Sequence, residues 1–183
     1  MGLTGSISLI VRYVETSSPG IHLPQGRITI DFIFRTYTLR PMNETPERPA
    51  GPRESSLCPC KSRETYGTCC QPFHLGRAKP ETAEQLMRSR YSAFFFRLVD
   101  YLVSTHHPDT REPDLKNRLE ETIYEPTWRF LTILGSSKGG PQDKIGKVEF
   151  VAEYFQDEQP HELHERSRFK RYKGAWKYLD GRG

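Results

Sequence analysis

Apolar and polar residues alternate in two segments near the start of the chain, Ser6–Val14 and Arg27–Leu39. A period of two is typical of half-buried strands, so both segments are predicted to be β-strands joined by a loop at 17–20. An isolated pair of strands is marginal in water, so these strands would need to dock on another part of the protein. Two interpretations of residues 1–41 stay open: they belong to the native protein, or they are an extension from a mis-assigned start, with Met42 as the first residue.

A proline-rich stretch follows. Residues 42–57 contain Pro46, Pro49 and Pro52 and almost no apolar side chain, which is typical of a disordered linker. Cysteines begin directly afterwards. We therefore divide the chain into an N-terminal extension (1–41), a linker (42–57), a cysteine-bearing segment called the knuckle below (58–76), and a folded domain (77–183).

Apolar residues recur at helical spacing from residue 82 onward. Thr82 and Gln85 have the spacing of a capping box, which predicts the start of a helix. The apolar stripe that follows consists of Met87, Tyr91, Phe94, Phe95, Leu98 and Leu102. It predicts one long helix that ends at His107, because a residue before proline disfavours helical geometry. A shorter helix is predicted over 114–124.

Beyond Pro126 the alternating pattern returns. Strands are predicted at 128–134, 147–154, 161–170 and 176–179, with turns at 139–141 and 173–174. Helices followed by an antiparallel meander predict an α+β fold. Apolar residues make up 35% of the chain and the mean hydropathy is -0.70. Because no apolar run could span a bilayer and no export signal is present, we expect a cytoplasmic protein without membrane contact.

Four cysteines, Cys58, Cys60, Cys69 and Cys70, lie within a short polar segment. Disulfides between such close neighbours would be strained, and a cytoplasmic compartment is reducing. Two further interpretations are four unreactive buried thiols, and a site for another metal or for redox chemistry. A closed tetrahedral site for one structural zinc ion fits the spacing best. We expect this metal to lie outside the core of the folded domain.

The cysteine segment CPCKSRETYGTCC resembles the SEC-C zinc motif, which also occurs at the tail of the preprotein-translocase ATPase. Downstream segments are similar to the YchJ family of small bacterial proteins: LMRSRYSAF at 86–94, DYLVSTHHP at 100–108, and ELHERSRF and GAWKYLDG within 162–181. The resemblance implies a zinc motif followed by a nuclear-transport-factor-2-like (NTF2-like, cystatin-like) cone, in which helices wrap a curved antiparallel sheet. It implies no particular reaction.

The chain departs from the family pattern at two places. Lys61 stands where family loops usually carry glycine, and if that position needs a positive φ, lysine costs some strain. Longer family members carry a second SEC-C motif, which this sequence does not contain. The chain therefore matches the short form, and we expect no partner bound through that second motif.

Candidate pocket residues lie within the family-like segments: Arg88, Arg90, Tyr91, His107 and Glu165. Strand alternation places Glu165 on the same face as Phe169, which marks the inner face. A buried carboxylate needs a cation, and Arg88 or Arg90 is the expected partner. The result is either an internal ion pair or a ligand clamp with Glu165 as general base. His107 either caps a helix or acts as an acid–base group, whereas His106 is expected on the surface.

Charge argues against a nucleic-acid partner, because 27 Lys and Arg are interspersed with 23 Asp and Glu for a net charge of +4. Common catalytic motifs are also absent from the sequence, which favours a non-enzymatic role and leaves an enzyme as the alternative. The first hypothesis is a small zinc-binding module that contacts another protein. The second is an enzyme or small-molecule binder that uses the cone pocket.

Overall fold

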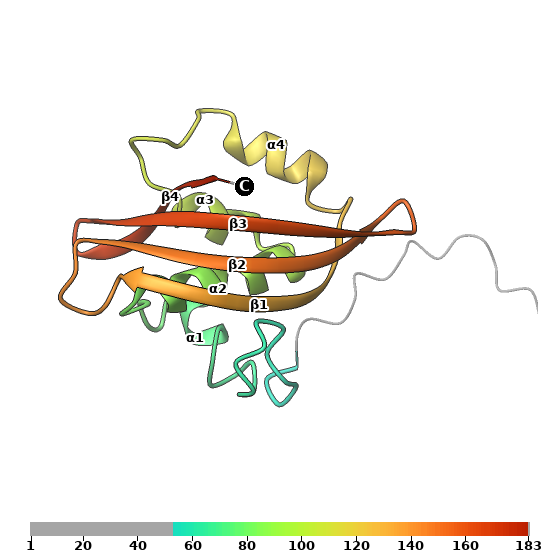
Figure 1. The fold of residues 1–183 in the computed structure, drawn as a ribbon, viewed down its shortest axis with the longest axis horizontal. Helices are drawn as coiled ribbons and strands as arrows, with labels where there is room; N and C mark the ends of the chain where they lie inside the picture. The colour runs from blue at the N-terminus through green and yellow to red at the C-terminus, as the bar shows by residue number, and fades with distance from the viewer. Residues whose placement is uncertain (1–52, 183) are drawn as a thin grey trace, which may run out of the picture. The chain divides into compact units, whose positions relative to one another are not determined.

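The computed structural model describes residues 53–182 (Figure 1). The strands predicted within 1–41, and most of the predicted linker, lie outside these residues. The described part contains four helices and one sheet, as the pattern predicts for an α+β fold.

The sheet has four antiparallel strands in the order β1-β2-β3-β4. They are β1 (Thr127–Lys138), β2 (Ile145–Gln156), β3 (Gln159–Tyr172) and β4 (Ala175–Arg182). Each is longer than predicted, because ladder pairing continues past the apolar alternation up to the turns. Val148, Phe150 and Ala152 of β2 are buried on one face, as their alternation predicts.

The helices are α1 (Gln71–His74), α2 (Ala83–Phe95), α3 (Val99–Ser104) and α4 (Leu115–Thr122). The capping box is confirmed: the Gln85 amide N–H donates to Thr82 Oγ1 at 3.1 Å, and the Thr82 N–H donates to Gln85 Oε1 at 3.2 Å. Helix α2 packs on the sheet, behind it in the view of Figure 1, and α3 packs against α2 and α4.

The prediction of one long helix that ends at His107 is wrong, because the chain breaks between α2 and α3. Arg97 has a left-handed φ of 60°. The Leu98 N–H donates to the Ala93 carbonyl at 2.8 Å, the bond that closes a Schellman-type helix end. Leu102 of α3 then packs with Ala93 in a small second core. The apolar residues keep their helical spacing on both sides of the break. The pattern therefore did not reveal the break.

The main core joins the sheet, α2 and the knuckle. Leu86, Tyr91, Phe150 and Trp176 belong to one cluster of buried residues that also contains Cys58, Cys60, Tyr66 and Cys70. Our expectation that the metal lies outside the core of the folded domain is therefore wrong. The apolar faces of α2 and of the knuckle are buried together, so the two segments form one packing unit.

Candidate metal centre and cone cavity

The four cysteine sulfurs come together at the junction of the knuckle and α2. Their Sγ atoms all lie within 4.8 Å of one another, and none forms a disulfide. Cys60 and Cys69 are 3.5 Å apart, and Cys69 and Cys70 are 3.7 Å apart. Sulfurs on a tetrahedral zinc ion, with bonds of about 2.3 Å, would be separated by about 3.8 Å. The donor set therefore fits a closed tetrahedral ion.

A tight loop gives the first two cysteines their geometry. The Lys61 N–H donates to the Cys58 carbonyl at 3.1 Å, and Lys61 and Arg63 have φ values of 61° and 73°. Lys61 thus occupies the left-handed region that glycine would adopt freely, as anticipated from the family pattern. The strain is about 1 kcal/mol per such residue.

The pKa values of the four thiols favour a bound cation at this site. Hydrogen bonds from Cys58 and Cys69 hold the pKa of Cys60 well below its usual range, whereas hydrogen bonds to Cys58 and Cys60 raise the pKa of Cys70. Without a cation the four groups cannot ionise together. A bound divalent ion would stabilise all four thiolates, because a coordinated thiol is deprotonated outright.

Polar groups of α2 support the cysteines. Ser92 Oγ lies 3.5 Å from Cys58 Sγ and 3.4 Å from Cys70 Sγ. Arg88 pairs with Glu84 at 2.8 Å and donates to the Cys60 carbonyl at 2.8 Å. Arg88 is therefore turned toward the knuckle and does not line the cone cavity, contrary to its selection as a pocket residue.

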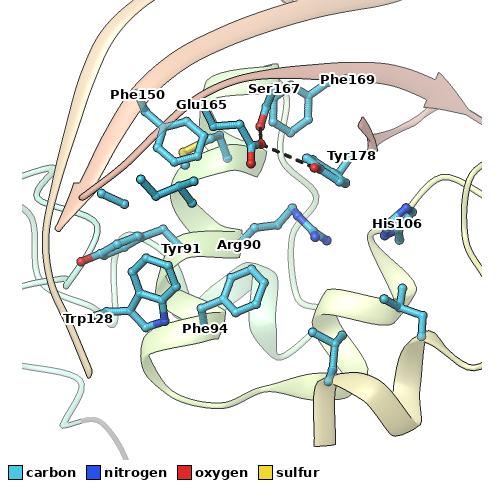
Figure 2. Close-up of a pocket in the computed structure, with 15 residues that line it drawn as sticks. Arg90, Tyr91, Phe94, His106, Trp128, Phe150, Glu165, Ser167, Phe169 and Tyr178 are labelled. Atoms are coloured by element: carbon cyan, nitrogen blue, oxygen red, sulfur yellow. Dashed lines mark hydrogen bonds between the residues drawn. The ribbon is translucent and has the colours of Figure 1, made fainter. Parts of the chain in front are cut away.

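A cavity of about 320 Å³ opens between the inner face of the sheet and helices α2 and α4 (Figure 2). Most of its wall is apolar, with aromatic rings from Tyr91, Phe94, Trp128, Phe150, Phe169 and Tyr178. Polar groups gather at one end and come from Arg90, His106, Glu165 and Ser167. The interior of the cone is thus open rather than completely filled.

Glu165 has its carboxylate directed into this cavity (Figure 2). Its Oε1 accepts hydrogen bonds from Ser167 Oγ and from the Tyr178 hydroxyl, the latter at 3.5 Å. No hydrogen bond to Oε2 is present among residues 53–182, and Glu165 forms no ion pair there with Arg88 or Arg90. The predicted helix-to-sheet ion pair is therefore wrong. The carboxylate is placed to accept a hydrogen bond from a bound molecule.

Arg90 is buried but finds its partners within the helices. Its Nη1 donates to the Leu102 carbonyl at 2.8 Å and to Thr105 Oγ1 at 2.7 Å, and its guanidinium lies 4.6 Å from the centre of the Tyr178 ring. Burial lowers the pKa of Arg90 to about 10, so the group stays charged at neutral pH. The polar end of the cavity therefore contains one cation and one carboxylate that do not neutralise each other by direct contact.

Of the two neighbouring histidines, His106 lines the cavity and His107 does not, contrary to the choice of His107 as the pocket residue. His106 lines the cavity, and desolvation together with the nearby Arg90 lowers the pKa of His106 to about 4, so its ring is neutral. His107 is fully buried and does not line the cavity. Its backbone N–H donates to the Tyr178 carbonyl at 2.7 Å, and its ring Nδ1 accepts from the backbone N–H of Asp109 at 3.2 Å. Sequence reasoning missed His106 because nothing local to His106-His107-Pro108 shows which ring faces inward.

Tyr91 lines the apolar end of the cavity, as its place on α2 suggested. Its ring makes an edge-to-face contact with Trp128, with centroids 5.8 Å apart. Its hydroxyl is buried without a hydrogen-bond partner among the described residues. Tyr91 therefore contributes shape and apolar surface.

Comparisons with known proteins agree with this architecture. Residues 82–181 match the model of the YchJ middle NTF2-like domain. A UPF0225 protein of Geobacter sulfurreducens is 37% identical over 129 residues, covering 70% of this chain and 80% of the relative. A UPF0225 protein of Streptomyces avermitilis is 43% identical over 136 residues, covering 73% and 89%.

Two solved structures are similar in fold. The solution structure of a SEC-C motif containing protein from Rhodopseudomonas palustris has a TM-score of 0.61 and 31% identity, covering 69% of this chain and 97% of that one. The crystal structure of a SEC-C motif containing protein from Psychrobacter arcticus has a TM-score of 0.59 and 28% identity, covering 69% and 82%. Among residues 53–182, no helix has the length and apolarity needed to cross a membrane.

Proposed function

The chain belongs to the YchJ family, and from that premise we propose that its NTF2-like domain binds a small, largely apolar, uncharged molecule in the cone cavity. One observation carries this proposal. The carboxylate of Glu165 faces a largely apolar cavity, and its Oε2 accepts no hydrogen bond among the described residues. A bound molecule that carries a donor can hydrogen-bond to this oxygen, which gives the cavity one defined polar contact.

The volume, walls and charges of the cavity indicate which kind of ligand it can bind. Its volume of about 320 Å³ lies at the lower end of the range for ligand pockets, which limits the ligand to a small one. Aromatic walls favour a planar apolar body. Because Arg90 and Glu165 balance in charge and His106 is neutral, the polar end favours an uncharged head group with a donor for Glu165.

The four cysteines would hold one zinc ion as a structural support for this pocket. Cys58, Cys60, Cys69 and Cys70 supply the four sulfur ligands that zinc prefers, in a site with no open position for a reacting water. The metal would fix the knuckle against α2, whose other face carries Arg90 and Tyr91. Its role in the proposal is to order the helix that forms one wall of the cavity.

Benzamide is a suitable probe, since it combines an aromatic ring with an uncharged donor. We expect saturable shifts of the Trp128 indole and of the Ala152 and Leu163 methyl NMR signals when benzamide is added to the metal-loaded protein. N,N-dimethylbenzamide, which lacks the donor, should bind more weakly by about tenfold, the value of one hydrogen bond to a charged group.

Two variants and one control test the assignment. Ala152→Leu should fill the cavity and abolish binding, and Glu165→Gln should weaken it while changing the free energy of unfolding by less than about 1 kcal/mol, because no ion pair is broken. Glu149→Gln, on the outer face of the sheet, serves as the control. Unchanged affinity in both cavity variants, or equal affinity for the two amides, would overturn the proposal.

A further inference from the structure

A second depression lies outside the cone, between the knuckle, the end of α2 and the start of β1. Its floor exposes apolar side chains: Leu57 is 73% exposed, Phe130 is 52% exposed and Phe95 is 43% exposed. Three large apolar side chains with this exposure in one groove are unusual for a surface without a partner. We call this depression the knuckle groove.

The charge of the knuckle groove has one sign. Five cations line it, namely Arg53, Lys61, Arg63, Arg97 and Arg129, and no acidic residue does. All five are exposed, and none forms an ion pair with another residue among 53–182. In the rest of the described surface several cations are paired, as Arg166 is with Glu149 and Arg168 with Asp180. The groove is therefore complementary to an acidic partner.

One wall of the groove is the edge of the sheet. Strand β1 is paired with β2 on one side, and within residues 53–182 no backbone hydrogen bond joins the outer edge of Thr127–Phe130 to another segment. The register of β1 shifts between Trp128 and Phe130, so the regular edge is interrupted at Arg129. The unpaired backbone groups of this edge can still bond to an extended segment. An extended peptide lying there could place alternate side chains against the apolar floor and the cations.

Two cations of the knuckle loop, Lys61 and Arg63, have strained backbone conformations. Lys61 adopts a positive φ, and its Nζ lies 3.9 Å from the centre of the Phe130 ring, across the groove. Arg129 precedes Phe130 at the irregularity of β1 and is exposed. The cationic rim thus comes from both sides, from the knuckle and from β1.

We propose that the knuckle groove binds an extended, acidic segment of a partner protein that carries apolar residues between its carboxylates. A single-stranded nucleic acid is the less favoured occupant, since it needs free aromatic faces for base stacking. Here Lys61 covers one face of the Phe130 ring, and the Phe95 and Phe96 rings pack edge to face with centroids 5.2 Å apart. A nucleic acid would also leave the hydrogen-bonding groups of the strand edge unused.

The test uses the metal-loaded protein and a fluorescein-labelled peptide of alternating glutamate and leucine, followed by fluorescence anisotropy. Saturable binding is expected, and the same peptide with lysine in place of glutamate should not bind. Lys61→Glu combined with Arg129→Glu should weaken binding by at least about tenfold, since two attractive contacts become repulsive. Arg129→Glu alone, which leaves the knuckle intact, should give part of that loss.

A matched control carries the same change in net charge outside the groove. Arg77 and Lys79 are exposed and do not line the groove, so Arg77→Glu combined with Lys79→Glu should leave peptide affinity within about twofold. Equal losses in the two double variants, or no binding of the acidic peptide, would overturn the proposal. Tighter binding of labelled oligouridylate than of the peptide would overturn the partner class. Glu165→Gln should not change peptide affinity, which separates this site from the cone cavity.

Discussion

Gly181 sits directly beneath the carboxylate of Glu165, and this contact gives the sharpest test of the cavity geometry. A Cβ atom added at Gly181 would overlap Glu165 Cδ and Oε1 and lie 2.8 Å from its Cγ. The distal half of the Glu165 side chain would have to move. We therefore predict that Gly181→Ala displaces the carboxylate that faces the cavity.

The expected magnitude has two parts. The atoms in the way are the far end of the flexible Glu165 side chain beside an open cavity, so the steric cost should lie at the lower limit for overpacking, about 1 kcal/mol. Gly181 is not among the glycines with positive φ, so alanine fits its backbone and gains about 0.4–1 kcal/mol by restricting the unfolded chain. In a Glu165→Ala background the steric cost disappears and the gain remains. The coupling energy between the two positions should therefore equal the steric cost, about 1 kcal/mol.

Urea unfolding of the four proteins of this double-mutant cycle, at equal metal content, measures the coupling. Gly135→Ala is the matched control, because a Cβ there would meet no atom within 4 Å, and it should change stability equally in both backgrounds. Equal effects of Gly181→Ala with and without the Glu165 side chain would refute the placement of Glu165 over Gly181.

Three further predictions concern the knuckle, the cavity histidine and the helix break. Cys70→Ser should lose the metal and at least about 3 kcal/mol of unfolding free energy. Because the cysteines belong to the same core as Trp176, the loss should appear in the unfolding transition followed by tryptophan fluorescence. An unchanged transition would contradict the shared core. The pKa of His106 is about 4 in the folded state against an ordinary 6.5, so the fold favours the neutral ring and is fully stable above pH 6.5. As the pH falls from 6.5 to 4, the free energy of unfolding should decrease by about 1–2 kcal/mol. This is less than the full pKa shift implies, because the ring is partly exposed. The His106→Gln variant should lack that part of the pH dependence. If the pH profiles of the variant and the wild type were parallel, His106 would not be the group responsible. Arg97→Gly should be neutral or up to about 1 kcal/mol stabilising in thermal unfolding, since φ is 60° there; clear destabilisation would show that the Arg97 side chain holds the helix break.

Local signals in the sequence were sufficient for the helix cap and for the inner face of β2. Thr82 and Gln85 satisfy each other within one turn, and the burial of Val148 and Phe150 follows from strand geometry alone. The closeness of the four cysteines also follows from their spacing. These features depend on residues that are near one another in the chain.

The partner of Glu165 could not be predicted in this way, and the missed helix break explains why. Because the chain turns at Arg97, α3 brings the Leu102 carbonyl and Thr105 to Arg90. Both acceptors bind the Nη1 group of Arg90 and hold the guanidinium toward α3, and no ion pair joins Arg90 to Glu165 among the described residues. A continuous helix would have placed the same acceptors elsewhere. One left-handed residue thus changed the assignment of two candidate site residues.

The central claim is that the cone cavity is a ligand site whose polar contact is Glu165. A crystal structure of the metal-loaded protein soaked with benzamide tests it most directly. We predict density for the ring among Tyr91, Trp128 and Phe150, with the amide nitrogen within about 3.2 Å of the Glu165 carboxylate, the limit for such a hydrogen bond. A cavity closed by its own side chains, or benzamide bound only elsewhere on the protein, would contradict the account.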